Sequence, residues 1–273
     1  MKKTFLILGL VLLALFALYL FLIAPRMSGK PDMSAMMGYH YAHRGYFDNE
    51  GGVPENSLPA FSAAIDAGYA IELDVQLSSD GAAMVFHDAS LARMCGAEGN
   101  IWDYTKDELK EMKLFGTEET IPTLEEALAL IGGRVPVLVE YKMDKVDSAV
   151  CEAGHALLKD YDGAYAVQCF HPLALMWYKK NAPDIPRGQL AQQFYKQAKY
   201  RTSPAHYVMT YLLSNVVTRP DFISYKYSDA GSVSLNLCRL MGAKTAAWTP
   251  RDPAHYEQVK GDFDLYIFDS FAL

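Results

Sequence analysis

Short apolar segments alternate with helical segments over most of this chain, and this alternation restricts the folds that it can adopt. From residue 136 on, strands are predicted at 136–142, 165–170, 186–190, 222–227, 244–249 and 265–269. Helices are predicted between them, near 146–160, 172–181, 193–215, 229–241 and 253–260. Nearly continuous apolar strands separated by helices are typical of a parallel sheet with both faces covered.

Ahead of these strands, residues 71–88 show a pattern of strand, turn and returning strand. Glu72, Asp74 and Gln76 alternate with apolar residues, as in a strand with one polar and one apolar face. The Ser-Ser-Asp-Gly that follows supplies turn residues, after which residues 83–88 return. Alone, this pattern fits a functional site and an edge hairpin with a solvated polar face equally well.

The length of the turn decides where the returning strand places His87. A two-residue loop at Ser79 and Asp80 puts His87 opposite Glu72. A three-residue loop with Gly81 in a bulge shifts the register by one residue and turns His87 to the other face. In either case, carboxylates and an imidazole meet at one end of the hairpin.

A strand ending near His43 and the first arm of the hairpin bring the number of predicted parallel strands to eight. Eight strand–helix units in about 235 residues are what a TIM (β/α)8 barrel requires. The second arm, which carries His87, is then an extra segment, and residues 89–121 are predicted to be a small insertion after the second strand. An open doubly wound sheet is the alternative, but no glycine-rich dinucleotide-binding sequence follows the first strand.

The N-terminus differs sharply from the rest in composition. Residues 5–24 contain no charge, and a helix of this length spans roughly 30 Å, the thickness of a bilayer core. No A-x-A-like cleavage site follows, so residues 1–26 are predicted to be an uncleaved, single-pass signal anchor in the cell membrane. Lys2 and Lys3 favour a cytoplasmic N-terminus with the remaining chain outside the cell, although basic residues on the other flank weaken this orientation.

Residues 27–38 are predicted to be a linker and residues 39–273 a single barrel domain. The net charge of −7 argues against a general nucleic-acid-binding protein, which needs a basic surface. It does not exclude an anionic small-molecule substrate, because a few local cations or a metal ion can outweigh a diffuse field.

Polar side chains gather at the predicted strand ends, where the functional face of a β/α barrel lies. Glu72, Asp74 and Glu140 would repel one another there, so a divalent cation with oxygen ligands is the natural neutraliser. The same ends carry His43, Arg44, His87, Lys142, Gln168 and Trp248. A single histidine is more often structural, and it is the joint pattern that indicates a site.

Several sequence segments resemble the glycerophosphodiester phosphodiesterase family. The most specific are His43-Arg44-Gly45, Pro54-Glu55-Asn56-Ser57, Glu72-Leu73-Asp74-Val75-Gln76-Leu77 with Asp80-Gly81, and Val85-Phe86-His87-Asp88. Later segments agree in order: Pro122-Thr123-Leu124-Glu125-Glu126, Glu140-Tyr141-Lys142, Gln168-Cys169-Phe170 and Ala247-Trp248-Thr249.

This resemblance implies a TIM barrel with a small insertion after the second strand. It also implies metal-dependent hydrolysis of glycerophosphodiesters to glycerol 3-phosphate and an alcohol. Transferred by position, the family roles make Glu72, Asp74 and Glu140 ligands of Ca²⁺ or Mg²⁺. His43 and His87 become the acid–base pair, and Arg44 becomes the phosphate-binding residue.

The chemistry of phosphodiester hydrolysis agrees with these roles. Negative charge grows on the phosphoryl oxygens in the transition state, where a metal ion and Arg44 would stabilise it. Imidazoles ionise near neutrality, so His43 and His87 can exchange protons with the substrate. Lys142 is a further candidate for contact with phosphate or glycerol. Trp248 is a candidate wall for the glycerol, and core packing explains Trp248 equally well.

Three positions depart from the family pattern. Ser57 stands where threonine is usual, Cys169 replaces a serine, and residues 266–270 lack the usual Asp-Gly and Thr-Asp pairs. The metal and histidine set is intact, so an active enzyme is expected.

Two other functions are compatible with the same fold. A catalytically silent barrel acting as a binding domain should lack a metal carboxylate or a histidine, and neither is missing. Phospholipase D-like hydrolysis of lysolipids would use the same site. The apolar residues of 191–217, beside a membrane anchor, would suit that activity, although such residues more often simply cover a barrel.

Overall fold

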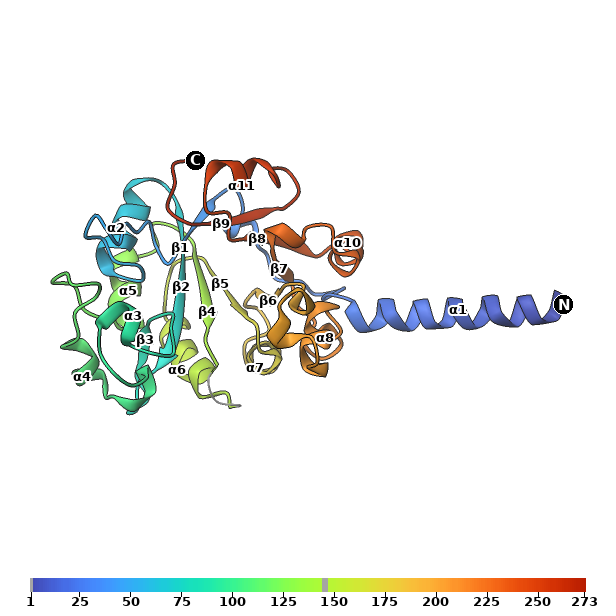
Figure 1. Ribbon diagram of the computed structural model, residues 1–273, viewed down its shortest axis with the longest axis horizontal. Coiled ribbons are helices and arrows are strands. Elements are labelled where there is room, and N and C mark those ends of the chain that lie inside the picture. Colours follow the sequence, from blue (N-terminus) through green and yellow to red (C-terminus); the bar gives the residue numbers. More distant parts are fainter. Residues whose placement is uncertain (1, 144–146) are drawn as a thin grey trace.

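The computed structural model describes residues 2–143 and 147–273, and its centre is a closed barrel. Eight parallel strands form this barrel: β1 (His40–His43), β2 (Ala70–Leu77), β4 (Val137–Tyr141), β5 (Tyr165–Cys169), β6 (Arg187–Ala191), β7 (Phe222–Lys226), β8 (Lys244–Trp248) and β9 (Leu265–Phe268). The pairing of β1 with both β9 and β2 closes the ring. Helices surround it (Figure 1). The predicted TIM barrel is confirmed, and the open-sheet alternative is wrong.

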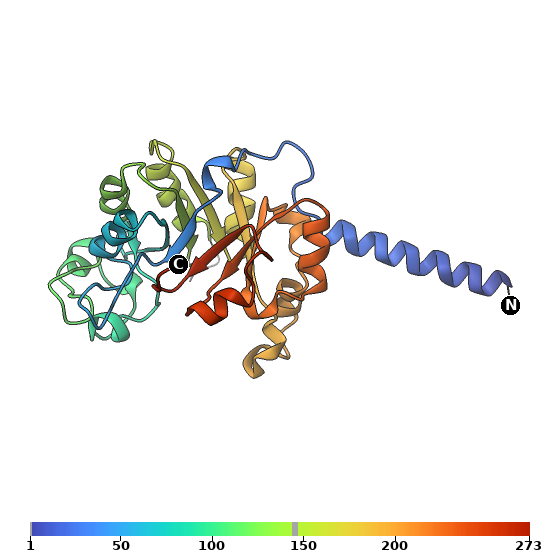
Figure 2. The same cartoon turned by 90° about the horizontal axis from the view of Figure 1, so that it is seen from above.

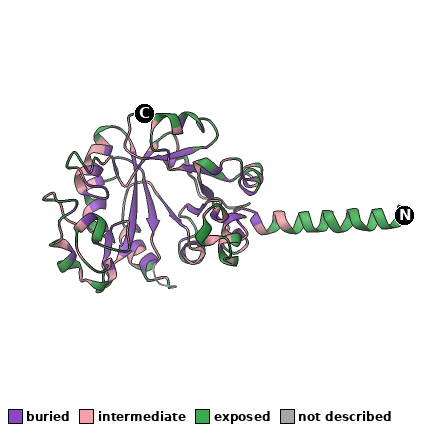
Figure 3. Cartoon of the chain, in the orientation of Figure 1, coloured by how far each residue is buried: buried purple, intermediate pink, exposed green. Residues whose placement is uncertain are grey.

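Alternation of side chains along each strand builds two apolar layers. On the outer face of β2, Leu73 and Val75 pack against the helices, whereas Ala70 packs inside the barrel. Figure 3 shows buried strands, with the exposed residues on helices and loops. Because alternate positions face inward, Glu72 and Asp74 follow Ala70 on the interior side of β2, towards its carboxyl end.

Local sequence sets where the covering helices begin. Thr123 caps α5 and Glu126 completes a capping box. Ser57 caps α2, and its hydroxyl accepts the N–H of Ala60 at 3.3 Å. The predicted start of α6 near residue 146 falls outside the described residues. These helices are α2 (Leu58–Asp66), α5 (Leu124–Ile131), α6 (Ala149–Leu158), α7 (Pro172–Asn181), α10 (Val233–Leu240) and α11 (Pro253–Glu257).

The helical stretch predicted near residues 193–215 is not one continuous helix. This region contains 3-10 turns at Phe194–Lys196 and Ala198–Tyr200, followed by α8 (Pro204–Thr210) and α9 (Asn215–Thr218). Proline has no backbone N–H and disfavours helical geometry in the residue before it, and Ser203 is extended at ψ 113°. The connection from β6 to β7 is therefore a series of short helical pieces.

The hairpin adopts the three-residue loop. β3 (Ala83–Val85) pairs antiparallel with β2, and the register places residues 79–81 in the loop with Gly81 at φ +83°. The consequence expected for His87 is nevertheless wrong, because His87 lines the same cavity as Glu72. Beyond β3 the returning chain is no longer a strand, and the side-chain amide of Gln76 donates to its carbonyls. The alternation of side chains along a strand therefore does not determine where His87 points.

Residues 89–121 lie between β3 and α5 and pack around a hydrophobic cluster of their own. They contain α3 (Ala92–Cys95), a 3-10 turn at Ile101–Asp103 and α4 (Lys106–Lys110). The cluster comprises Met84, Phe86, Leu91, Met94, Ile101, Leu109, Leu114 and Ile121. Because the first two of these belong to the returning arm of the hairpin, the segment packs on the arm that delivers His87.

The N-terminal helix α1 (Lys2–Ile23) projects away from the barrel (Figures 1 and 2). Among the described residues, it is the one helix long and apolar enough to cross a bilayer. Most of it is exposed, but Ile23 at its end is fully buried against the barrel. The segment after it contributes to the core, since Met36 is buried in the interior cluster and Tyr41 donates to its carbonyl at 2.7 Å.

Candidate active site

Strand register brings the candidate residues together at the carboxyl ends of β1, β2, β4 and β5. His43 lies opposite Glu72 in the β1–β2 pair. Asp74 lies opposite Glu140 in the β2–β4 pair, and Glu140 opposite Gln168 in the β4–β5 pair. Residues in register on neighbouring barrel strands point to the same side, so these side chains converge at one end of the interior.

Glu72, Asp74 and Glu140 form a compact acidic cluster. Ligand oxygens from the three carboxylates all lie within 4.8 Å of one another, and all three residues are buried. Burial, together with the charges of Asp74 and Glu140, raises the pKa of Glu72 well above its usual value. The cluster therefore resists carrying three negative charges unless a cation accompanies it.

Two cations of the chain lie against this cluster. The Lys142 ammonium contacts the carboxylates of both Glu140 and Asp74, the latter at 2.9 Å. Arg44 Nε is 3.6 Å from Asp74 Oδ2, and the Arg44 backbone N–H donates to Glu72 at 3.2 Å. Burial alone would raise the pKa of Asp74, but the surrounding positive charges, Lys142 first, outweigh it and lower this pKa. Asp74 is thus held as an anion.

An unusual turn after β1 gives Arg44 its position. Arg44 has φ +61°, which residues other than glycine rarely adopt, and Gly45 follows at φ +82°. A Cβ at position 45 would lie 2.8 Å from the backbone of Ala60, so only glycine fits there. The carbonyl of Arg44 accepts the N–H of Asn56 at 2.8 Å, and its guanidinium binds Glu55 at 2.6 Å. The loop before α2 therefore holds this turn in place.

An aspartate holds each candidate acid–base histidine. His43 Nδ1 lies 2.5 Å from Asp269 Oδ1, and His87 Nδ1 lies 2.7 Å from Asp88 Oδ1. An imidazole bound at Nδ1 is fixed in orientation, and its Nε2 remains the nitrogen that a substrate can reach. Both histidines line the same cavity.

That cavity has a volume of about 130 Å³ and lies at this end of the barrel. The predicted residues in its wall are His43, Arg44, Glu72, His87, Glu140, Lys142 and Trp248. Asp74 is completely buried next to it and does not reach its wall. The structure thus places all eight predicted site residues at one end of the barrel.

Three charged residues of the site, Asp88, Asp269 and Arg251, were not among the predicted site residues. Asp269 follows β9, and the strand-end position that singled out the other carboxylates could have identified it. Arg251 lines the cavity with its Nε 3.5 Å from Asp269 Oδ2, and it comes from a loop in which no sequence pattern marks it.

The Glycerophosphoryl diester phosphodiesterase family matches this chain over residues 43–272. The match includes every strand end described above. The chain belongs to this family.

The chain spans about two thirds of the length of the curated family members that it resembles. It is 36% identical over 162 residues to a glycerophosphodiester phosphodiesterase of Caldanaerobacter subterraneus subsp. tengcongensis, covering 55% of this chain and 65% of that protein. It is 34% identical over 172 residues to a glycerophosphodiester phosphodiesterase of Bacillus altitudinis, covering 58% and 68%.

Solved structures of the glycerophosphodiester phosphodiesterase type share the fold over most of this chain. A phosphodiesterase of Oleispira antarctica, in complex with the product sn-glycerol-3-phosphate, is 26% identical with a TM-score of 0.70, covering 86% of this chain and 94% of that one. The glycerophosphodiester phosphodiesterase of Thermotoga maritima is 27% identical with a TM-score of 0.62, covering 85% and 95%.

The acidic cluster of this family member has the chemistry of a site for a hard divalent cation. Its donors are carboxylate oxygens, the ligands that Ca²⁺ and Mg²⁺ prefer, and they lie close enough together to share one ion. The raised pKa of Glu72 reflects the same need for positive charge. These residues therefore fit the metal that the family resemblance implies.

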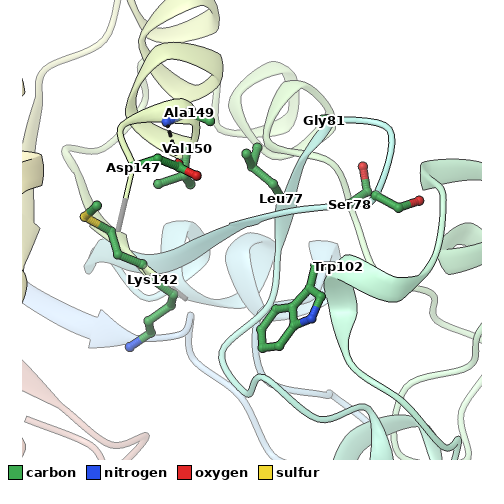
Figure 4. Close-up of a pocket in the computed structure, with 10 residues that line it drawn as sticks. Leu77, Ser78, Gly81, Trp102, Lys142, Asp147, Ala149 and Val150 are labelled. Atoms are coloured by element: carbon green, nitrogen blue, oxygen red, sulfur yellow. Dashed lines mark hydrogen bonds between the residues drawn. The ribbon is translucent and has the colours of Figure 1, made fainter. Parts of the chain in front are cut away.

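A second cavity, of about 220 Å³, shares Lys142 with the first. Figure 4 shows Leu77, Trp102 and Val150 around it, with the Lys142 ammonium directed away from them. These three side chains come from the end of β2, the 89–121 segment and α6. Apolar side chains therefore lie next to the charged cluster in this member of the family.

Proposed function

We propose that this protein hydrolyses glycerophosphodiesters to glycerol 3-phosphate and an alcohol. The observation that carries the proposal is that His43 and His87, each held by an aspartate, line one cavity together with Arg44 and the acidic cluster. Membership of the family supports the same reaction, and the related Oleispira antarctica enzyme was solved with sn-glycerol-3-phosphate as its product.

The charged residues would bind the phosphate and stabilise the negative charge that grows on it. Glu72, Asp74 and Glu140 would hold Ca²⁺ or Mg²⁺, which when bound supplies Lewis-acid stabilisation to the phosphoryl oxygens. Arg44 lines the same cavity and offers its guanidinium to the phosphate. Lys142 adds a second cation for phosphate or glycerol.

Proton transfer falls to the two imidazoles. One imidazole takes the proton of the attacking oxygen, and the other protonates the oxygen of the leaving alcohol. The attacking oxygen is either that of a water molecule, which gives glycerol 3-phosphate directly, or that of the neighbouring glycerol hydroxyl, which gives a cyclic phosphate that water then opens to glycerol 3-phosphate. Nε2 is the exchanging nitrogen in each ring, since Nδ1 faces Asp269 or Asp88. Trp248 provides a wall for the glycerol, and its indole N–H is anchored on the carbonyl of Ser224 at 3.1 Å.

The full chain, purified in detergent, tests this reaction directly. We expect release of glycerol 3-phosphate from glycerophosphocholine and glycerophosphoglycerol, its loss with EDTA, and its recovery with Ca²⁺ or Mg²⁺. His43→Ala and His87→Ala should abolish turnover and leave metal binding largely intact. Turnover that is absent, or unaffected by EDTA, would overturn the mechanism.

We also propose that α1 anchors the protein in the cell membrane with the barrel outside the cell. Its length and apolar composition support an anchor, and Lys2 and Lys3 support a cytoplasmic N-terminus. Alkaline carbonate should leave the protein in the membrane pellet. Protease added outside intact cells should digest the barrel. A soluble protein, or a barrel protected from the protease, would exclude this topology.

The cavity beside Lys142, which has apolar side chains in part of its wall, favours lysolipids as a second substrate class. Leu77, Trp102 and Val150 offer apolar contacts for an alkyl chain next to the phosphate-binding residues. Lysophosphatidylcholine would then yield lysophosphatidic acid and choline at the same site. Leu77→Asp should reduce this activity and spare glycerophosphocholine hydrolysis. An equal effect on both substrates would argue against a role for the cavity.

A further inference from the structure

The last turn of α1 is built into the wall of the barrel. Ile23 is fully buried, and its carbonyl accepts hydrogen bonds from Asn215 Nδ2 at 2.7 Å and Cys238 Sγ at 3.3 Å. Arg219 donates to the carbonyls of Phe21 and Ala24, each at 2.9 Å. The final carbonyls of a helix lack partners within the helix, and here the barrel supplies them. The direction of α1 is therefore fixed relative to the barrel.

These contacts also fix the level at which the barrel meets α1. The Tyr19 hydroxyl lies 2.8 Å from Ser234 Oγ at the start of α10, and Tyr19 precedes Ile23 by about 6 Å along the helix. If α1 spans the bilayer, as proposed above, residues 19–24 lie at the outer boundary of the hydrocarbon core. The start of α10 and the whole of α9 must then lie at that boundary too.

Exposed apolar side chains surround this junction. Val233, beside Ser234, is 69% exposed, and Val217 of α9 is 43% exposed. Tyr211, which follows α8, is 42% exposed and lines a cavity of about 420 Å³ together with Tyr19 and Val233. Tyrosines are enriched at membrane–water interfaces, where the ring contacts lipid and the hydroxyl contacts water.

Basic side chains lie among the same elements. Arg219 stacks its guanidinium 4.8 Å from the centre of the Phe21 ring, and Lys179 donates to the carbonyl of Val217 at 2.8 Å. Cations at the level of the lipid phosphates are favoured in membranes with anionic lipids. Both the apolar side chains and the cations therefore match a lipid surface rather than open water.

Tyr207 on α8 is 43% exposed, and its ring stacks on that of Tyr211. We propose that Tyr207, Tyr211, Val217 and Val233 form a surface that rests on the outer leaflet of the membrane holding α1. In Figure 1, α1 points across the direction of β2 and β4, so the wall of the barrel, and not an end, faces the bilayer. The mouth of the candidate active site then opens along the membrane surface. The β6–β7 connection, which carries three of the four residues, starts at that mouth.

Photo-crosslinking of the full chain in nanodiscs of phosphatidylcholine and phosphatidylglycerol tests this surface. A benzophenone amino acid is placed at Tyr211 or Val233, both exposed enough to accept it. Asp107 on α4, at the opposite end of the molecule in Figure 1, is the matched control. Leu13 within α1 reports insertion of the helix.

We expect lipid adducts at positions 211, 233 and 13 and none at 107. Adducts at 13 with none at 211 and 233 would overturn the surface while leaving the anchor in place. No adduct at 13 would refute the anchor itself. Adducts at 107 as well as 211 would show that labelling does not depend on the face of the barrel and would equally overturn the inference. Thermal unfolding of each labelled protein confirms that it is folded.

Discussion

Asp269 and Asp88 determine which imidazole nitrogen faces the candidate cavity. Each carboxylate lies within hydrogen-bond distance of a histidine Nδ1, and a carboxylate in that place orients the ring and stabilises its protonated form. Asp88 also binds Arg93 Nε at 2.6 Å. The Asp269 carboxylate has a different second partner, because it lies 3.5 Å from Nε of Arg251 in the cavity wall.

Asp269→Asn should lower kcat with little change in KM. The amide keeps the shape of the side chain but no longer stabilises a charged His43, so a loss of about 100-fold is expected, within the range for acid–base catalysis. Steady-state kinetics on glycerophosphocholine would measure it, with thermal unfolding as the control for folding. A rise in KM at constant kcat would mean that Asp269 acts on substrate binding instead.

Lys142→Met should destabilise the protein when divalent cations are absent. Its partly buried ammonium lies between the buried carboxylates of Asp74 and Glu140, so removing it leaves buried negative charge uncompensated, at about 3–5 kcal/mol of unfolding free energy. Urea unfolding in EDTA would measure this loss, and added Ca²⁺ or Mg²⁺ should restore much of it.

The matched control for that variant is Lys110→Met. Lys110 pairs with Glu126 at 2.8 Å, but both side chains are partly exposed, so its loss should cost at most about 1 kcal/mol with or without the cation. If Lys142→Met behaved in the same way as the control, the acidic cluster would not depend on positive charge.

Strand β2 is longer than its neighbour β1, and this difference shapes the site. Its first residues pair with β1, whereas Val75 to Leu77 pair with β3 on the same edge, beyond the end of β1. The returning arm therefore stands at the carboxyl end of the barrel, where it delivers His87. Because this arm lies beyond the end of β1, it packs in part against residues from outside the barrel strands.

A series of ion pairs connects the 89–121 segment to the loops of the candidate active site. Arg93 on α3 binds Glu55 at 2.7 Å and Asp88 at 2.6 Å, and Glu55 in turn binds Arg44. Burial would raise the pKa of Glu55, but hydrogen bonds from Arg93 and the charges of both arginines outweigh it and lower this pKa from 4.5 to about 2. The bridge thus connects the segment to Arg44, the proposed phosphate-binding residue, and to Asp88, which holds His87.

Stability should depend on pH through Glu55. Because its pKa is lower in the folded state than in the unfolded state, its contribution is complete above about pH 5 and is lost as the pH falls towards 2. At most roughly 3 kcal/mol is involved. Urea unfolding should show the stability difference between the native chain and Glu55→Gln shrinking over this range.

Glu125→Gln on α5 is the control for this pH dependence, since Glu125 is exposed and forms no ion pair with described residues. Its stability difference from the native chain should stay near zero at every pH. A difference for Glu55→Gln that did not change with pH would show that the residue acts through packing alone.

In the whole molecule, α1 and the barrel share a small core. Ile23 belongs to the buried cluster that contains Leu212, Leu235 and Cys238. A helix that served only as a tether would need no such contact. The end of α1 is therefore part of the packed core of the domain.

A chain that starts at residue 25 should be less stable than one that starts at residue 18. The shorter chain exposes the site of Ile23 and leaves the buried Asn215 amide without its acceptor, at a combined cost of about 3–5 kcal/mol. Urea unfolding of both chains in one detergent would measure the difference. Equal stabilities would mean that the docking of α1 contributes nothing to folding.

Much of the fold follows from local sequence. Apolar periodicity predicted all eight barrel strands, and the start of α5 is set by a local capping box of Thr123 and Glu126. Polar residues at strand ends predicted the cluster of Glu72, Asp74 and Glu140, because parallel strands in a barrel end at the same side. These features depend on neighbours in sequence or on the general geometry of the fold.

Other features were decided only by the tertiary structure. The partners His43 and Asp269 lie 226 residues apart, and only closure of the barrel between β9 and β1 brings them together. His87 reaches the cavity because the pairing of β2 with β3 ends before this residue. The alternation of polar and apolar residues does not show where that pairing ends. The buried position of Ile23 likewise depends on contacts with elements some 200 residues away in the sequence. Hydrophobic periodicity and helix-capping residues determine local structure, because they depend on neighbours in the sequence. Contacts between residues far apart in the sequence form only when the barrel has folded.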